Sequence, residues 1–436
     1  MMWPKTHFVQ EVFDKAEEIV GKEVTLAGWV YHKREHGKLI FIDLRDGTGV
    51  IQVSIHKDHV DDGIFRKAEE VTRESSIIIK GTVKKDPRAP GGYEISLKEL
   101  EIVGLAEEWP IPLNASTSLL FDMRHLHLRS ERQRAILLIR ESAFDAAKEY
   151  FQKDGWVEVH PPIFITAACE GGATLFEVKY FDRKAYLTQS SQLYLEALIY
   201  TLEKVFCIAP SFRAEKSRTR RHLTEFWHIE AEAAWLELDE IMKVEENLVS
   251  YICQTVAKER SKELEVLGRD PKDLLKVKPP FERISYDEAI ERLQKKGLDV
   301  KWGADLGTVE EKKLAEDFDK PFFIYKYPKE IKAFYHMPDP ERPEIVLCND
   351  LIAPEGYGEI IGGGQRIHDK ELLLKRIIED GYDPKDYGWY IDLRRYGTVP
   401  HSGFGLGADR VVSWICKLSH IREAVPFPRT YTRLYP

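Results

Sequence analysis

A short loop in the middle of the chain carries many more cations than acids. Its basic residues are Arg213, Lys216, Arg218, Arg220 and Arg221. Only Glu215 lies among them, and Phe226 follows shortly after the last one. Cations this crowded repel one another in water, so the pattern favours a bound polyanion over a merely solvated hairpin, which is the alternative. An aromatic side chain next to a polyanion site could stack on a planar base.

The segments on either side of this loop have strand character. Val205–Ile208 precedes it, and Phe226–Trp235 follows with apolar and polar residues in alternation. Period-two alternation is typical of a half-buried strand. We therefore expect a β-hairpin that presents the basic loop at its tip.

A glycine-rich run, Gly403–Gly407, lies near the C-terminus and is followed by Asp409, Arg410 and a helical segment, Val411–Leu418. It is a poor dinucleotide-binding fingerprint, because no parallel βαβ unit surrounds it. Tight glycines would let the backbone approach a nucleotide closely, with Arg410 in the first turns of the helix. A turn with an arginine at a helix start, and no ligand, is the alternative.

Two acids, Asp350 and Glu359, flank a turn-rich segment that also contains Glu355. A second glycine run, residues 362–364, and Arg366 follow. Mg²⁺ that bridges phosphates is usually held by one or two carboxylates, with water in the other positions. Asp350 and Glu359 are therefore candidate ligands, with a solvated loop as the alternative for each acid.

The first hundred or so residues are predicted to form a five-stranded β-structure. The expected strands are Glu23–Val30, Lys38–Arg45, Gly49–Ile55, Ser75–Lys84 and Tyr93–Val103. A helical stretch, Asp62–Arg73, falls between the third and the fourth strand. This order is typical of an OB-fold barrel, which commonly reads oligonucleotides.

The rest of the 436-residue chain is long enough for a second core. Periodicity lapses from Gly104 to about Ser130, which indicates a linker. An amphipathic helix then runs through Ile136 and Tyr150, and a strand at Trp156–His160 is stopped by prolines. Residues 236–280 are predicted to be mostly helical. Further strands are expected at 321–327 and 331–335.

Composition limits the class of protein. The chain is 31% charged and 43% hydrophobic, as expected for a globular protein, and no apolar run approaches the roughly 20 residues of a membrane span. Its five cysteines are scattered and fit reduced thiols in the cytoplasm. The net charge of −9 argues only weakly against nucleic-acid binding, because a basic channel can coexist with an acidic exterior.

Taken together, these segments resemble the class II aminoacyl-tRNA synthetases. Phe212–Phe226 matches motif 2, the long helix with its strand and proline matches motif 1, and Gly403–Arg410 matches motif 3. The resemblance implies an α+β fold. An OB-fold anticodon-binding domain would span residues 1–104, a linker 105–130, and a catalytic domain, an antiparallel sheet flanked by helices, 131–436. Motif 1 further implies a homodimer.

The resemblance assigns roles to the nucleotide-binding residues. Arg213 would contact the α-phosphate, Glu215 the adenine amino group, and Phe226 would stack on adenine. Arg410 would hold the γ-phosphate together with Arg221 and His222 of the basic loop. The implied ATP-binding residues are Arg213, Glu215, Arg221, His222, Leu223, Phe226, Glu359, Gly407 and Arg410. Arg213 and Arg410 would be catalytic, and Asp350 and Glu359 would hold Mg²⁺.

The choice of amino acid depends on a few positions within the aspartyl, asparaginyl and lysyl subgroup. Aspartyl enzymes have a lysine that neutralises the substrate's carboxylate where this chain has Leu195. Glu230 lies two strand positions past the Trp-His of motif 2, and a carboxylate there suits an amide donor and repels a second carboxylate. Arg366 would donate to the amide oxygen. The implied amino-acid-binding residues are Glu170, Ser190, Gln192, Glu230, Gly362 and Arg366.

Three of these residues, Glu170, Ser190 and Gln192, would bind the α-amino group. The glycines after Glu170 suit a loop that flips shut over the substrate, and a static loop is the alternative. In the barrel, the resemblance implies that Phe41 stacks on the central anticodon uridine while Gln52 and Arg34 contact it. A phenylalanine in the barrel core is the alternative for Phe41.

The implied reaction is ATP-dependent ligation of L-asparagine to tRNA(Asn) through asparaginyl-adenylate. ATP and Mg²⁺ would be the cofactors, and no membrane partner is expected. Three alternatives remain: an aspartyl-tRNA synthetase of relaxed specificity, a non-catalytic tRNA-binding paralogue, and a synthetase that makes free asparagine through an adenylate. Leu195 and Glu230 disfavour the aspartyl enzyme. The complete set of phosphate-binding residues disfavours the non-catalytic paralogue, and the complete barrel disfavours the synthetase of free asparagine.

Overall fold

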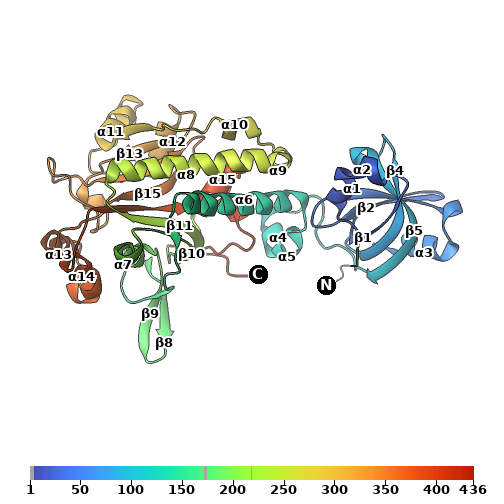
Figure 1. Ribbon diagram of the computed structural model, residues 1–436, viewed down its shortest axis with the longest axis horizontal. Coiled ribbons are helices and arrows are strands. Elements are labelled where there is room, and N and C mark those ends of the chain that lie inside the picture. The colour runs from blue at the N-terminus through green and yellow to red at the C-terminus, as the bar shows by residue number, and fades with distance from the viewer. Residues whose placement is uncertain (1–3, 171–173, 218) are drawn as a thin grey trace. The chain divides into compact units, whose positions relative to one another are not determined.

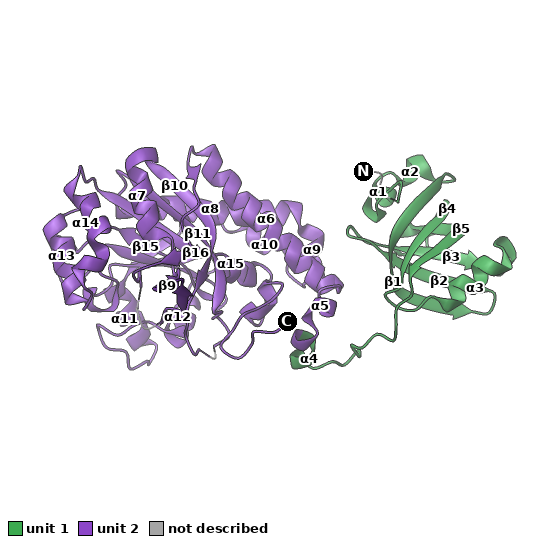
Figure 2. Ribbon diagram, turned by 90° about the horizontal axis from the view of Figure 1, so that it is seen from below, with its two compact units in different colours: residues 1–120 green, residues 121–436 purple. Residues whose placement is uncertain are grey.

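The structure is a computed structural model that describes residues 4–170, 174–217 and 219–436. The chain forms two compact units, residues 1–120 and 121–436 (Figure 2). The division falls inside the segment that the sequence marks as a linker. That segment contains two short helices, α4 (Thr117–Asp122) and α5 (Arg124–His127). Arg124 is buried and donates to the backbone oxygens of Val425 and Pro426, which ties α5 to the second unit.

The first unit is a closed five-stranded barrel, which confirms the OB-fold prediction. The strands are β1 (Glu23–His36), β2 (Leu39–Arg45), β3 (Val50–His56), β4 (Ser76–Lys85) and β5 (Tyr93–Gly104). They pair in the order β1-β2-β3-β5-β4, and α3 (Asp62–Glu70) lies between β3 and β4. Side chains alternate along each strand, so that Ile40, Ile42 and Leu44 of β2 are buried.

Two helices before the barrel were not predicted. They are α1 (Val9–Asp14) and α2 (Ala16–Ile19). Val9 and Val12 are fully buried in the barrel's apolar cluster. Each helix is too short to show a clear helical period in the sequence, and packing against the barrel stabilises both.

The second unit is built on an eight-stranded sheet. Its strands are β6 (Val157–Glu158), β10 (Lys204–Phe212), β11 (Glu225–Ala234), β12 (Glu282–Ser285), β13 (Phe322–Tyr325), β14 (Cys348–Ala353), β15 (Gly358–Gln365) and β16 (His401–Gly407). The order is β12-β13-β14-β15-β16-β11-β10-β6. The six central strands are antiparallel, as expected, and each edge strand pairs in parallel.

Long helices cover one face of this sheet. Figure 1 shows α6 (Glu131–Lys153) and α8 (Leu238–Glu259) lying across it. The sheet contributes alternate residues such as Ile229, Ala231 and Leu406 to the core that these helices close. The intervening residues of the same strands therefore point to the opposite face, where the site lies.

The remaining elements lie on both sides of the sheet. The helices are α7 (Gln192–Leu202), α9 (Ser261–Val266), α10 (Pro271–Leu275), α11 (Tyr286–Lys295), α12 (Thr308–Ala315), α13 (Lys370–Glu379), α14 (Gly388–Arg395) and α15 (Ala408–Ile415). Of these, α9, α10 and α15 contribute to the same core as α6 and α8. A small sheet pairs β7 (Phe164–Ile165), β9 (Arg183–Leu187) and β8 (Glu177–Tyr180). Within the described ranges, no helix is long and apolar enough to cross a membrane.

One predicted strand is wrong. Residues 331–335 do not pair as a strand next to β13; a short 3-10 turn, Lys329–Ile331, and irregular backbone occupy this stretch. An apolar residue of this stretch, Phe334, is instead buried against Tyr382 and Tyr387. A short apolar run does not by itself distinguish a strand from a buried loop.

Candidate active site

The basic loop is held by a regular hairpin, as the sequence predicts. β10 and β11 pair antiparallel as far as Phe212 and Glu225, and the Arg213 amide donates to the Thr224 oxygen at 3.0 Å. The ladder therefore continues up to Arg213. This fixes the backbone from which the Arg213 side chain enters the site.

The glycines of β15 and β16 form an open floor beside this hairpin. Gly362 lies opposite Gly405, and Gly364 opposite Gly403. The turn considered as the alternative for this run is wrong, because Gly403–Gly407 is a regular strand. Its glycines are needed for space: a Cβ on Gly403 would lie 2.0 Å from the Glu232 carboxyl carbon. Bare backbone thus leaves room for the buried acids of the next strand and for a ligand above the sheet.

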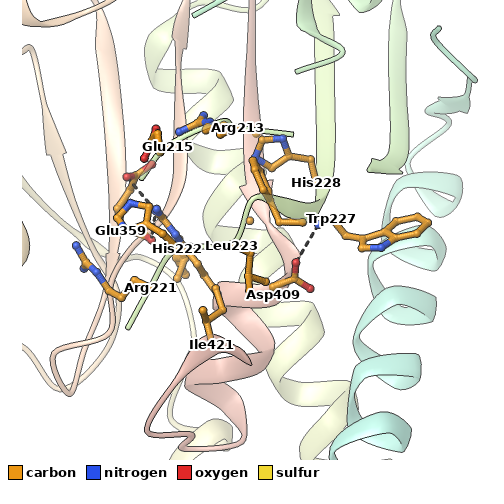
Figure 3. Close-up of a pocket in the computed structure, with 15 residues that line it drawn as sticks. Arg213, Glu215, Arg221, His222, Leu223, Trp227, His228, Glu359, Asp409 and Ile421 are labelled. Carbon is orange, nitrogen blue, oxygen red and sulfur yellow. Dashed lines mark hydrogen bonds and ion pairs between the residues drawn. The ribbon is translucent and has the colours of Figure 1, made fainter. Parts of the chain in front are cut away.

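All nine candidate ATP-binding residues line one cavity at the end of this floor. Figure 3 shows several of them pointing into it. The other residues that line it were not among the ATP-binding candidates; they are Trp227, His228, Ile360, Gly405, Asp409 and Ile421. A guanidinium from each side of the cavity, Arg213 and Arg410, faces the same space, which suits an anionic ligand.

A larger cavity, about 660 Å³, continues from this end along the floor. It is lined by all six candidate amino-acid-binding residues. Arg213, Arg410 and Glu359 line both cavities, so the two form one continuous site. The structure therefore brings together residues that are more than 200 positions apart in the sequence.

Arg213 lies where the two cavities join. Its Nη2 lies 2.6 Å from Glu170 Oε2, and Tyr335 Oη donates to Glu170 Oε1 at 3.3 Å. Glu170 raises the pKa of the guanidinium, against the effect of burial. The loop predicted to close over the substrate, residues 171–173, lies outside the described residues.

Arg410 is placed by Glu359 on the opposite side. Its Nη1 donates to the Glu359 backbone oxygen at 2.9 Å and to Oε2 at 3.1 Å. Burial raises the pKa of Glu359, but Arg410, Lys332 and Arg213 outweigh it and lower this pKa to about 2. Glu359 is therefore an anion under all ordinary conditions.

Asp350, the second candidate metal ligand, has a cationic partner of its own. Lys332 Nζ lies 2.9 Å and 2.7 Å from its two carboxylate oxygens. A Cβ on Gly362 would lie 3.2 Å from Glu359 Oε1 and 3.7 Å from Asp350 Oδ1. Both carboxylates thus reach one small volume above the strand. The described residues contain no group of three or more side chains arranged to hold a metal.

Arg221 is anchored to a different part of the chain. It donates to Glu311 of α12, to the Tyr357 oxygen at 3.2 Å and to Thr308 Oγ1 at 3.1 Å. Gly358 makes this possible, because a Cβ there would lie 1.4 Å from Arg221 Nη1. Arg221 therefore connects the basic loop to α12 while still lining the cavity.

Two buried acids of β11 define the amino-acid end. Glu230 is 3% exposed and accepts from Ser190 Oγ and from the Ser191 amide, the latter at 2.8 Å. Burial raises its pKa, and the Ser190 hydroxyl opposes this. Glu232 pairs with Arg366, whose Nη2 donates to it at 2.6 Å. Both acids are therefore buried and hydrogen-bonded, and neither lies on a solvated strand face.

Leu195 does not line the cavity. It is fully buried in an apolar cluster with Ile199, Val205, Cys207 and Ala234. The described residues also place no lysine or arginine from α7 in the site. Arg366, which is paired with Glu232, lines the same cavity as Glu230.

His228 lines both ends of the site and was not singled out from the sequence. Its Nδ1 lies 3.0 Å from Ser211 Oγ. Burial, with Arg213 and Arg410 nearby, lowers its pKa to about 3. His228 is therefore neutral at physiological pH and adds no charge to the site.

In the barrel, the candidate anticodon residues gather on the outer face. Phe41 is half-buried there, between the buried Ile40 and Ile42, so it is not a core residue. Arg34 lies opposite Phe41 on β1, with its guanidinium carbon 5.7 Å from the ring centroid. Its Nη2 also donates to Gln52 Oε1 at 3.0 Å.

Several site residues could not be chosen from local sequence patterns. Glu232 had a usable signal, because it lies two strand positions after Glu230 and so on the same face. Lys332 and Glu311 had none, since Lys332 lies in irregular backbone and Glu311 on a short helix of mixed composition. Only the fold brings them to the cavity.

This barrel and this sheet with its basic hairpin define a class of protein. The family model for tRNA synthetases class II (D, K and N) matches residues 116–431, and that for the OB-fold nucleic acid binding domain matches residues 24–103. The chain belongs to the class II tRNA synthetases of this group.

Within the class, the relatives are specific. The asparagine–tRNA ligase of Pyrococcus furiosus is 58% identical over 96% of this chain and 97% of its own. The Thermococcus kodakarensis asparagine–tRNA ligase is 57% identical over 97% and 98%. The structure of Pyrococcus horikoshii asparaginyl-tRNA synthetase complexed with asparaginyl-adenylate matches with a TM-score of 0.97, at 57% identity, covering 100% of both chains.

Proposed function

We propose that this protein ligates L-asparagine to tRNA(Asn) in two steps, through asparaginyl-adenylate at the expense of ATP. One observation carries the proposal: a single cavity joins a phosphate-binding end, with Arg213 and Arg410, to an amino-acid end with Glu230 and Arg366. The high identity to asparagine–tRNA ligases supports it. Translation takes place in the cytoplasm, so we place the protein there.

The amino-acid end offers groups that match asparagine. Glu230 accepts hydrogen bonds only, which suits the amide NH₂, and Arg366 donates only, which suits the amide oxygen. Arg366 uses Nε and Nη2 for Glu232, and the described residues give its Nη1 no partner. An aspartate side chain would bring a second carboxylate against Glu230 in a buried site, which is unfavourable.

The nucleotide end supplies charge stabilisation. With the asparagine carboxylate next to Arg213, attack on the ATP α-phosphate forms the adenylate and releases pyrophosphate. Arg213 and Arg410 are fixed by Glu170 and Glu359, so they stabilise the growing phosphate charge without rearranging. A terminal ribose hydroxyl of the tRNA, the 3′-OH by analogy with class II, then takes the acyl group. No nucleophile from the protein is required.

Asp350 and Glu359 would hold Mg²⁺, because both carboxylates reach one volume above Gly362. With only two carboxylates there, phosphate and water oxygens would complete the shell. Bound in this way, Mg²⁺ neutralises phosphate charge. In the absence of the metal, Lys332 compensates the charge of Asp350 and Arg410 that of Glu359.

We expect Glu359→Gln to raise the Mg²⁺ concentration for half-maximal pyrophosphate exchange by about tenfold or more, because an amide replaces one of two carboxylates. Lys332→Met should instead lower this Mg²⁺ concentration, since it leaves Asp350 without its cation. Titration of exchange activity with Mg²⁺ checks both. An unchanged requirement in both variants would exclude Asp350 and Glu359 as the metal site.

The barrel is proposed to read the anticodon through Phe41, Gln52 and Arg34. Phe41→Ala should lower kcat/KM for tRNA about 5- to 150-fold, because base stacking on an aromatic ring contributes roughly 1–3 kcal/mol. Asparagine-dependent pyrophosphate exchange should stay within about twofold, as it needs no tRNA. A parallel fall of exchange, aminoacylation and Tm would instead assign Phe41 a structural role.

We also propose a homodimer. The segment after α6 exposes several apolar side chains, Val157, Ile163 and Phe164 at 40%, 39% and 51%. β6 is moreover an edge strand of the main sheet. Exposed apolar residues at a sheet edge favour an interface with another chain. Sedimentation equilibrium, compared with the chain mass of 50.5 kDa, tests this.

Pyrophosphate exchange with asparagine and aspartate in parallel tests the proposed function. Exchange with asparagine, followed by charging of tRNA(Asn), is expected. Equal exchange with aspartate would favour the relaxed aspartyl enzyme. Exchange with asparagine but no charging of tRNA would favour a synthetase that makes free asparagine. The absence of any exchange would favour a non-catalytic paralogue.

A further inference from the structure

A fully buried carboxylate lies behind the amino-acid end of the cavity. Glu196, on α7, is 0% exposed. It accepts from Tyr390 Oη at 2.8 Å and from Arg394 Nη2, and lies 2.9 Å from His401 Nε2. These partners come from α14 and β16. Such a complete set of partners is what allows a charge to be buried.

Glu196 also contacts a residue that lines the cavity. Gln192 lies one helical turn earlier, and its Nε2 donates to Glu196 Oε1 at 3.1 Å. A carboxylate only accepts hydrogen bonds, so the Gln192 amide must turn its nitrogen toward Glu196. Its oxygen then remains on the cavity side, where the described residues give it no hydrogen bond.

The orientation of this amide matters for an amino-acid ligand. An α-ammonium group has three donors and no acceptor. The Gln192 oxygen would accept from it, beside the carboxylate of Glu170. The reversed amide would place an NH₂ against the ammonium, donor against donor. One flip of a single side chain therefore changes an attractive contact into a repulsive one.

We propose that Glu196 is a positioning residue for amino-acid binding: it holds the Gln192 amide with its oxygen toward the α-ammonium group of the substrate. This inference rests on the proposed function, because it takes the cavity end near Glu230 as the amino-acid site. Glu196 touches no substrate and acts only through Gln192.

A purely structural role is the alternative. Glu196 is the counter-ion of Arg394, so its loss leaves a buried cation unpaired, which is destabilising. That role predicts a lower Tm and a uniform loss of activity. The positioning role predicts a selective loss for ligands that carry an α-ammonium group.

The test is Glu196→Gln, which keeps the shape but can turn its own amide nitrogen toward Gln192 and so reverse it. We expect KM for asparagine in pyrophosphate exchange to rise about tenfold, with kcat and KM for ATP within about twofold. The inhibition constant of succinamic acid, which is asparagine without its amino group, should stay unchanged.

A double-mutant cycle with Gln192→Ala separates the two roles. Glu196→Gln should add no further rise in KM for asparagine once Gln192 is absent, because the effect is transmitted through that side chain. Tyr390→Phe is the matched control: it removes another partner of Glu196 and leaves Gln192 in place, so KM should stay within about twofold of wild type.

Equal effects of Glu196→Gln with and without Gln192, or an equal loss of succinamic acid binding, would overturn the proposal. If Glu196→Gln does not fold, the double variant Glu196→Gln/Arg394→Met is compared with Arg394→Met. Neither of these variants contains an unpaired Arg394, and the rise in KM for asparagine between them again measures the effect of Glu196. Should wild type activate only aspartate, the proposed function fails. The cycle is then run with aspartate and succinate, since the α-ammonium group is the same.

Discussion

Replacement of Arg213 by alanine is expected to reduce adenylate formation about 10²- to 10³-fold, roughly 3–4 kcal/mol, while the fold stays intact. Arg213 extends from the last pair of the β10–β11 ladder into the junction of the two cavities. It is fixed there by Glu170 at 2.6 Å. A guanidinium held in place near the α-phosphate stabilises charge that grows in the transition state, and alanine removes it completely.

Pyrophosphate exchange with saturating asparagine and ATP measures this effect. Arg220→Ala is the matched control, because Arg220 lies exposed in the same loop and does not line either cavity. It should keep exchange within about twofold of wild type. If Arg213→Ala and Arg220→Ala behave alike, the hairpin arginine has no part in the phosphate chemistry.

The second large effect concerns the choice of amino acid. Glu230→Gln should raise the ratio of kcat/KM for aspartate over asparagine at least tenfold, about 1.4 kcal/mol. Glu230 is buried in the cavity wall, so its charge is poorly screened and repels a second carboxylate. Glutamine has the same shape, removes the charge, and offers a donor to aspartate.

The dependence of this ratio on pH gives an independent check. Burial raises the pKa of Glu230, so it takes up a proton at a higher pH than an exposed glutamate does. Protonation removes the repulsion. In wild type the preference for asparagine should therefore weaken as the pH falls, whereas Glu230→Gln should show little change.

Glu225→Gln is the control for both measurements, because it makes the same change at an exposed position of the same strand. It should leave the ratio and its pH dependence as in wild type. A folded Glu230→Gln variant with the wild-type ratio would mean that discrimination against aspartate lies elsewhere. Arg366 and its partner Glu232 would then be the first residues to vary.

The sequence by itself determined the elements whose signals are local. Charge crowding between two segments of strand character predicted the hairpin and its basic loop. Strand periodicity and turn residues predicted the barrel. The family resemblance supplied nine nucleotide-binding and six amino-acid-binding candidates. The nine line the first cavity and the six line the larger one. Their roles toward a bound substrate remain predictions.

Local signals were misleading where packing decides the backbone. The glycine run at 403–407 is a strand of the central sheet, because its neighbours on β11 fill the space that its missing side chains leave. Residues 331–335 are irregular because Phe334 packs among tyrosines of a later segment. Nothing within either stretch distinguishes these outcomes.

Only the tertiary structure decided which charged groups meet. It pairs Lys332 with Asp350, Arg221 with Glu311, and Arg366 with Glu232. It also buries Leu195 among apolar residues and places Glu196 against Tyr390 and Arg394. The physical reason is common to all of them: a side chain's type and period are local properties, whereas its partner is set by strand order and by helices joined through distant segments.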